Sequence, residues 1–359
     1  MTSAPPLASR CVLVLGMHRS GTSVLARALI ALGVDFGSQL VESRADNPKG
    51  FFEDADANVM NDAFLEKIGC RWHSLRLPSE IPDEHVNHYR NEIRSTILEK
   101  FAATPFWGLK EPRITRLLPH WLAAMQETGI HPLHLLANRH PYSVAASLTR
   151  RDGLPVAQSL ALWALHQLDG LEAIAEHGGL VVDYDLLMAS PKQAVERLAT
   201  FLGISPQLQK TEIDHFIDEF LQADLRHAQF TVHSEAATPL QTLCLELHRQ
   251  ILALAAIPGG TPPPLPASAL DVMRETRARL EAMTEWMEAV DALHAEYSDQ
   301  LARLHGEHAA QMANGDRERE LRLKELHKTQ AQLEWLESRL PIKLYQQLKA
   351  RLQKSPDRR

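Results

Sequence analysis

Cysteine and long apolar runs are both scarce in this 359-residue sequence. The three cysteines include no Cys-x-x-Cys pair, so neither a disulfide framework nor a structural zinc site is expected, and a reducing compartment is the simplest environment. No run of about 18 apolar residues, enough to span a membrane, is present. The first residues also lack the apolar stretch of a signal peptide. These features predict a cytoplasmic protein, either soluble or attached peripherally to the inner face of the membrane.

The sequence also lacks an excess of positive charge. It contains 38 Lys and Arg residues against 45 Asp and Glu residues, for a formal net charge of -7. This balance excludes a wide basic surface for nucleic acid, and we expect no nucleic-acid partner. The apolar share of 45% and the charged share of 23% are those of an ordinary globular protein.

A Pro/Gly-rich stretch divides the chain. Residues 257–266 read IPGGTPPPLP, which cannot continue a helix and behaves as a semi-rigid extended linker. Residues 268–359 contain 16 basic and 16 acidic residues, so the net charge lies upstream of the linker. We predict a globular domain over residues 1–257, a linker over 258–267, a coiled coil over 268–340 and a basic amphipathic tail over 341–359.

Short apolar runs alternate with helical patterns upstream of the linker. The predicted strands are Val12–Leu15, Phe106–Leu109, Leu133–Ala137 and Leu180–Val182. The predicted helices are Val24–Leu32, Pro141–Arg151, Pro155–His177, Pro191–Leu202 and Pro239–Ala256. This alternation predicts an α/β fold, a P-loop-like parallel sheet flanked by helices and followed by a long C-terminal coiled-coil helix.

The first strand leads into a glycine-rich loop, Gly16-Met-His-Arg-Ser-Gly-Thr-Ser23. Its two glycines lie five residues apart and the loop leads into a predicted helix, a combination that favours anion binding over an inert turn. A nucleoside-triphosphate loop has a lysine after its second glycine, but Thr22 stands there. The positive charge lies instead at Arg19, within the loop.

This loop resembles the 5′-phosphosulfate loop of sulfotransferases that use 3′-phosphoadenosine-5′-phosphosulfate (PAPS), particularly the bacterial branch. Arg139 and, eight residues later, Ser147 are similar to the family's 3′-phosphate element. The stretches 107–113 and 182–191 also fit the family pattern, and the resemblance covers about residues 10–256.

The resemblance implies a PAPS-dependent transfer of a sulfuryl group to an acceptor hydroxyl, with a carbohydrate or glycan as the acceptor and no metal. Arg19 and Lys110 would stabilise the charge that develops on the bridging phosphate oxygen. Tyr184 is a candidate surface for the adenine, and Arg226 lies where relatives have a basic segment. The implied cofactor-binding residues are Gly16, Arg19, Ser20, Gly21, Thr22, Ser23, Arg139, Ser147, Tyr184 and Arg226.

A catalytic base is expected near an acidic motif at residues 47–54. Glu53 is our candidate because its motif resembles that of bacterial family members, although a solvated or helix-capping carboxylate has the same pattern. Glu42 and Glu111 are the alternatives. His18 and His140 flank the two anion elements and could help to hold phosphate.

Residues 268–340 carry a heptad pattern that predicts a coiled coil and a homo-oligomer. Apolar side chains such as Leu280, Met287 and Leu301 recur in a charged helix, and a helix folded back on the enzyme domain is the alternative. The last twenty residues contain six basic residues and one acidic residue among leucines spaced by four. This tail is either a peripheral membrane contact or a solvated basic segment.

Two other functions fit parts of the sequence. A phosphotransferase with a degenerate loop would lack its usual lysine, and no carboxylate set for Mg²⁺ is recognisable. A nucleotide-sensing coiled-coil scaffold without catalysis would keep the loop and the heptads. The retention of Arg19, Lys110, Arg139 and Ser147 favours the enzyme.

Overall fold

The computed structural model describes residues 10–43, 49–221, 238–257, 259, 265–266, 269–284, 300, 303–304, 322–332 and 334–335. The chain forms two compact units, one of residues 1–235 and 243–278 and the other of residues 236–242 and 279–359. In the second unit, residues 322–332 are helical. The candidate site lies entirely within the first unit.

A four-stranded parallel sheet forms the centre of the first unit. Its strands are β1 (Arg10–Leu15), β2 (Phe106–Lys110), β3 (Leu133–Asn138) and β4 (Leu180–Asp183), in the order β2-β1-β3-β4. All four predicted strands are present, each longer than predicted by one or two residues. The strand that follows β1 in the chain, β2, lies on one side of β1, and the next strand, β3, lies on the other side. The carboxyl ends of β1 and β3 therefore flank a switch point, the place where ligands bind in sheets of this kind.

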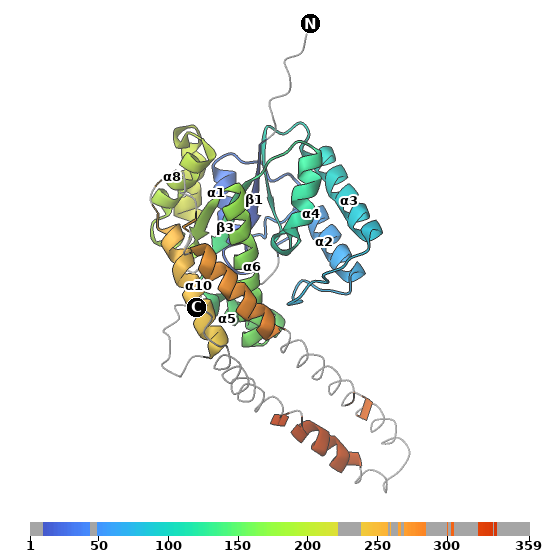
Figure 1. Ribbon diagram of the computed structural model, residues 1–359. Helices are drawn as coiled ribbons and strands as arrows, with labels where there is room; N and C mark the ends of the chain where they lie inside the picture. The colour runs from blue at the N-terminus through green and yellow to red at the C-terminus, as the bar shows by residue number, and fades with distance from the viewer. Residues whose placement is uncertain are drawn as a thin grey trace, which may run out of the picture. The chain divides into compact units, whose positions relative to one another are not determined.

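Helices cover both faces of this sheet, which confirms the predicted fold class (Figure 1). On one face, the apolar side chains of α1 and α8 share a core with alternate residues of β1, β3 and β4. On the other face α6 lies so close to β3 that a Cβ at Gly170 would stand 2.5 Å from Leu136. The helices of this α/β unit are α1 (Thr22–Ala31), α2 (Ala55–Lys67), α3 (Asp83–Phe101), α4 (Ile114–Glu127), α5 (Pro141–Asp152), α6 (Val156–His177), α7 (Tyr184–Ala189), α8 (Pro191–Leu202), α9 (Lys210–His215) and α10 (Pro239–Ala255), with short helical turns η1 (Pro206–Gln209) and η2 (Phe216–Phe220).

The long helices α2, α3 and α4, like the short α7 and α9, lie where the sequence patterns predict none. Polar residues dominate α2, which has no clear apolar period, and Pro119 interrupts the pattern of α4. In α3 the buried residues are spaced by four, a helical signal that our prediction did not use. Figure 1 shows α2, α3 and α4 grouped beside the β2 side of the sheet. They matter for function because α2 and the start of α4 supply several side chains of the candidate site.

The segment after the linker begins with a helix over residues 269–284, of which residues 269–278 belong to the first unit. Arg277 donates hydrogen bonds to Asp169 (2.7 Å) and Glu172 (2.6 Å) of α6, and Asp169 also pairs with Arg116 of α4 at 2.8 Å. Most predicted heptad positions, most of the linker and all of the tail lie outside the described residues. The domain boundaries, the coiled coil and the oligomer therefore stay predictions.

Candidate functional site

The loop after β1 is held close to its neighbours by two glycines. Gly16 has a φ of 131°, and a Cβ there would stand 2.7 Å from the carbonyl oxygen of Ala137 in β3. Gly21 has a φ of 90°, and a Cβ there would stand 2.7 Å from the Tyr184 ring. Both positions therefore require glycine for backbone conformation and for space. The result is a tight loop at the carboxyl end of β1.

The N-terminus of α1, which follows this loop, is a candidate anion site. Gly21 is the N-cap residue, and no side chain caps the first turn of α1. The first backbone N–H groups of a helix have no intrahelical partner, and its dipole favours a negative charge at this end. Ser20 is fully buried, and its Oγ has no hydrogen-bond partner. An orphaned hydroxyl beside uncapped amides fits a phosphate or phosphosulfate group.

The two predicted anion elements meet through Arg19. Its φ of 68° is unusual for a residue other than glycine, and its Nε donates a hydrogen bond to Ser147 Oγ of α5 at 2.8 Å. Arg139, just after β3, donates from Nη1 to the carbonyl oxygen of Arg19 at 3.4 Å. The Nε of Arg139 is buried without a partner. The structure thus brings Arg19, Arg139 and Ser147 together at one edge of the sheet.

Other predicted cofactor residues border this edge. Tyr184 is 6% exposed and lies against the loop, with the Arg139 guanidinium 4.5 Å from its ring centroid. Thr22 is buried at the start of α1, and Ser23 Oγ donates to the carbonyl oxygen of Phe51 at 3.2 Å. Arg226 lies outside the described residues. The role of Tyr184 as an adenine surface stays a prediction.

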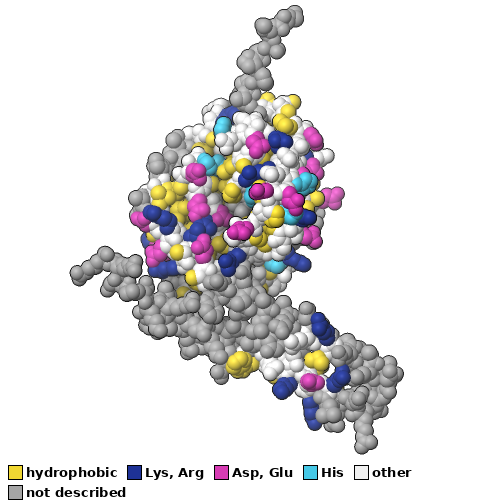
Figure 2. All heavy atoms as spheres, turned by 45° about the vertical axis from the view of Figure 1, so that its right-hand side comes forward, with side chains coloured by type: hydrophobic (Ala, Val, Ile, Leu, Met, Phe, Trp, Pro, Cys, Tyr) yellow, Lys and Arg dark blue, Asp and Glu magenta, His cyan; other side chains and the backbone are white. Residues whose placement is uncertain are grey.

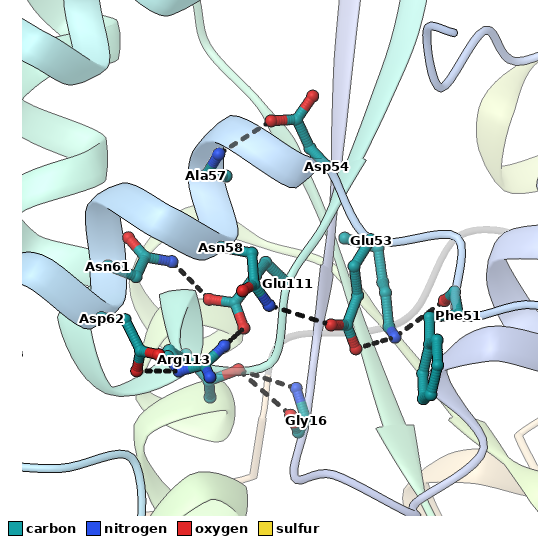
Figure 3. Close-up of polar contacts among 12 residues, drawn as sticks. Gly16, Phe51, Glu53, Asp54, Ala57, Asn58, Asn61, Asp62, Glu111 and Arg113 are labelled. Atoms are coloured by element: carbon teal, nitrogen blue, oxygen red, sulfur yellow. Dashed lines mark hydrogen bonds and ion pairs between the residues drawn. The ribbon is translucent and has the colours of Figure 1, made fainter. Parts of the chain in front are cut away.

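The end of β2 carries a buried ion pair between two predicted catalytic residues. Lys110 is 1% exposed, and its Nζ donates to Glu53 Oε1 at 2.6 Å and to the carbonyl oxygen of Phe51 at 2.9 Å. Asn58 Nδ2 donates to the other oxygen of Glu53 at 3.3 Å (Figure 3). An ammonium group has three N–H donors, and these two bonds use two of the donors of Lys110.

Glu53 is distinct from the residue that caps α2. Asp54 is the N-cap, and its side chain accepts a hydrogen bond from the Ala57 amide at 2.8 Å and pairs with Lys100 at 2.6 Å. Phe52, immediately before Glu53, has a φ of 54°, a conformation that costs free energy for a residue with a Cβ. The capping alternative for Glu53 therefore does not describe this structure.

A second buried carboxylate, Glu111, follows directly after Lys110. It is fully buried, accepts a hydrogen bond from Asn61 of α2, and pairs with Arg113 at 2.7 Å (Figure 3). Asn61 in turn accepts hydrogen bonds from Tyr89 at 2.5 Å and Trp121 at 3.1 Å. Burial raises the pKa of Glu111 from its ordinary value of 4.5 to about 7, against the opposing effect of Arg113.

Replacing Glu111 with Gln should reveal this buried titration. The unfolded carboxyl ionises near pH 4.5 and the folded one near pH 7, so the wild-type protein loses stability as the pH rises through that window. The neutral variant lacks this loss. Its free energy of unfolding relative to wild type should therefore increase by up to roughly 3 kcal/mol between about pH 5 and about pH 8, at about 1.4 kcal/mol per pKa unit. Denaturant melts at several pH values measure this difference, and a relative loss at high pH would show that the Arg113 pair dominates.

The remaining predicted candidates lie in different surroundings. Glu42 is exposed. His18 is 9% exposed, its Nε2 is buried without a hydrogen-bond partner, and its ring meets the edge of Trp72 at a centroid distance of 4.9 Å. His140 is the N-cap of α5 and lies 5.0 Å from the ring of His248. Burial, followed by nearby cations such as Arg113, holds the pKa of His18 well below its usual value.

A cavity of about 350 Å³ adjoins the loop and the ion pair. Two of the predicted residues, His18 and Glu53, lie in its wall. Its other side chains come from the segment before α2, from α2 itself, from the α2–α3 connection, from the start of α4 and from the end of α5. The lining residues are His18, Val41, Phe51, Glu53, Asn58, Asp62, Trp72, Arg113, Arg151 and Asp152.

Sequence reasoning gave no role to the other eight residues of this wall, among them Asn58, Asp62, Trp72 and Arg113. Asn58 and Asp62 are four residues apart, which places them on one face of α2, and that spacing becomes a signal only once the helix is recognised. Arg113 lies within the stretch 107–113 that resembles the family pattern, but only the fold pairs it with Glu111 and Asp62. Trp72 belongs to an irregular connection, for which no sequence period exists.

The parallel sheet and the glycine-rich loop at its switch point define the class of this protein, a P-loop-like α/β protein with a candidate anion site at the ends of its strands. The model of the sulfotransferase family matches residues 11–207. This match spans more than half of the chain, and the chain belongs to the sulfotransferase family. The family resemblance of the loop is thereby confirmed, and the reaction class is sulfuryl transfer.

Other comparisons add less. A comparison with curated proteins gives no significant match. Among solved structures, the sulfotransferase domain from the Synechococcus PCC 7002 olefin synthase is similar at 18% identity, over 68% of this chain and 95% of that domain, with a TM-score of 0.40. At this level of similarity it says nothing about substrate or mechanism. Among the described residues, no helix is both long and apolar enough to span a membrane.

Proposed function

We propose that this protein transfers the sulfuryl group of PAPS to an acceptor hydroxyl. One observation carries the proposal, the junction of Arg19 with Ser147 and Arg139 at the switch point of the sheet. A donor with a 5′-phosphosulfate and a separate 3′-phosphate needs two adjacent anion sites. The uncapped α1 and the buried, unpartnered Ser20 hydroxyl supply the first of these sites, and Arg139 with Ser147 supplies the second.

The residues around the donor site have separable roles in this reaction. Bound PAPS supplies the sulfuryl group, and the bond from sulfur to the acceptor oxygen forms as the bond from sulfur to the bridging phosphate oxygen breaks. Arg19 and Lys110 stabilise the negative charge that develops on that bridging oxygen. Glu53 receives the hydroxyl proton, and its bonds to Lys110 and Asn58 fix its orientation. The other product is adenosine 3′,5′-bisphosphate, and the reaction as proposed uses no metal.

The wider setting belongs to the same proposal. A carbohydrate or glycan is the acceptor class, and residues 268–340 join copies of the chain into a homo-oligomer. The basic tail brings a cytoplasmic enzyme to the inner face of the membrane. Acidic and basic side chains are interspersed on the face drawn in Figure 2, which supports the absence of a nucleic-acid partner.

Calorimetric titration with adenosine 3′,5′-bisphosphate, beside ATP with Mg²⁺, tests the donor class without knowledge of the acceptor. We expect tight binding of the bisphosphate and little response to ATP, because Thr22 stands where a triphosphate loop has lysine. A preference for ATP would favour a phosphotransferase. Binding of the bisphosphate without turnover of PAPS on any acceptor would favour a nucleotide-sensing scaffold.

A further inference from the structure

The cavity described above lies against the donor loop. His18 is a residue of that loop and Glu53 is the proposed base, and both line the cavity. A hydroxyl bound here is therefore close to the loop that holds the sulfuryl group and to the group that receives its proton. Its volume of about 350 Å³ is at the small end of the range of about 300 to 1,000 Å³ for ligand pockets, so it suits one small unit of an acceptor.

The wall of this cavity is unusually polar for a small-molecule site. Such sites are normally lined predominantly by apolar side chains. Here Val41, Phe51 and Trp72 are the apolar members of the lining, and the other members carry charges, an amide or an imidazole. A steroid, a simple phenol or a long alkyl alcohol would leave these groups without hydrogen-bond partners, which costs free energy.

The charged members of the wall are already paired with one another or with buried neighbours. Arg113 pairs with Asp62 at 3.1 Å and with Glu111 at 2.7 Å. Arg151 pairs with Asp152 at 2.7 Å, and Glu53 pairs with the buried Lys110. Each guanidinium of the lining thus has a carboxylate partner. A carboxylate or sulfate on the acceptor would compete with these internal partners and would meet like charge in the same wall.

Neutral hydroxyl groups can form hydrogen bonds with the polar side chains that line this cavity. A hydroxyl donates to a carboxylate and accepts from a guanidinium or an amide, so a polyhydroxyl ring can use Asp62, Arg113 and Asn58 without breaking an ion pair. Trp72 adds an aromatic surface for the C–H face of a ring. It is held in place by His18 at its edge and by the Arg151 guanidinium, 5.4 Å from its ring centroid.

We propose that this cavity is the acceptor site and that it selects an uncharged polyhydroxyl unit, such as a neutral sugar ring, over a uronate, a sulfated sugar or an apolar alcohol. The inference rests on the proposed function, because it assigns the acceptor of the same reaction. Asp62 is the residue that determines this specificity, because its carboxylate is already paired with Arg113, the cation that an anionic acceptor would need.

The experiment measures transfer from ³⁵S-labelled PAPS by the full-length protein to matched pairs of methyl glycosides. Each pair joins a neutral hexoside with the corresponding hexuronoside, and 4-nitrophenol and decanol serve as apolar acceptors. The wild type should favour the neutral member of a pair at least tenfold. Asp62→Asn should shift this ratio at least threefold toward the hexuronoside, because it leaves Arg113 with one carboxylate fewer.

Asp56→Asn is the matched control. Asp56 lies on the same helix, is 55% exposed where Asp62 is 56% exposed, and also forms an ion pair, with Lys100 at 2.7 Å, but it does not line the cavity. It should leave the acceptor ratio unchanged. Wild-type preference for uronosides or for the apolar acceptors, an unchanged ratio in Asp62→Asn, or no transfer to any glycoside would overturn the inference. Loss of adenosine 3′,5′-bisphosphate binding, or binding without transfer to any acceptor of the panel, would count against the proposed function. Transfer to the hexuronosides or to the apolar acceptors, with that binding intact, would count against this inference alone.

Discussion

Replacing Lys110 with Met is expected to abolish sulfuryl transfer and to lower the free energy of unfolding by about 3 kcal/mol or more. Lys110 and Glu53 are 1% and 6% exposed, and their charged atoms lie 2.6 Å apart. Loss of the ammonium leaves the Glu53 carboxylate buried without its counter-ion, a change that typically costs about 3 to 5 kcal/mol. It also removes the cation that, in the proposed reaction, stabilises the bridging oxygen.

The double variant Lys110→Met/Glu53→Gln separates these two effects. A neutral amide at position 53 removes the uncompensated buried charge, so the double variant should recover much of the lost stability. It should not recover turnover, because both the cation and the base are missing. Glu53→Gln alone should bind adenosine 3′,5′-bisphosphate normally and turn over slowly. Denaturant melts give the stability, and release of the bisphosphate from PAPS gives the turnover.

Lys100→Met is the control for a lysine whose role is structural. Lys100 also forms an ion pair with a buried carboxylate, the helix-capping Asp54, at 2.6 Å. Its ion pairs among the described residues are with Asp54 and Asp56, whereas Lys110 pairs with Glu53, the proposed base. Its replacement should cost stability and spare the turnover of the folded protein. If Lys110→Met loses no more turnover than Lys100→Met, Lys110 serves the fold alone.

The sequence predicts the sheet and the glycine-rich loop after β1 well because their signals are local. Each strand is a short apolar run that ends at a polar residue or a turn, and each lies in one continuous stretch. The backbone shape of the loop depends on Gly16 and Gly21, whose spacing is visible in the sequence. The proximity of Arg19 and Arg139 follows from the rule that parallel strands end at the same edge of the sheet.

The acceptor side is harder to predict because its contacts join distant stretches. Lys110 and Glu53 are each recognisable from their motifs, but only the fold makes them an ion pair. The polar helix α2 has no clear apolar period, so the sequence does not reveal that Asn58 and Asp62 share the wall of the cavity with Arg113. In this protein, the features that depend on one continuous segment can be predicted from the sequence, and the contacts between distant segments cannot.

Replacing Arg139 with Ala should weaken the binding of adenosine 3′,5′-bisphosphate about 10- to 100-fold. Its Nε is buried without a partner, and its guanidinium rests on the Tyr184 ring, so the fold holds it ready for an anion. A charge-assisted hydrogen bond contributes about 1.5 to 3 kcal/mol, which corresponds to this change in Kd. Arg139→Lys should give an intermediate loss, because lysine keeps the charge and loses the planar stacked group.

The comparison with 5′-AMP, which lacks the 3′-phosphate, shows which anion Arg139 holds. Arg139→Ala should leave the Kd of 5′-AMP nearly unchanged, whereas Arg19→Ala should weaken both nucleotides because Arg19 belongs to the 5′ loop. Arg150→Ala, an exposed arginine of the neighbouring α5, is the control and should change neither. An equal loss of both nucleotides in Arg139→Ala would mean that Arg139 acts by supporting the loop through its bond to the Arg19 carbonyl oxygen. In that case the 3′-phosphate would be held elsewhere, and the assignment of two anion sites to this edge of the sheet would be wrong.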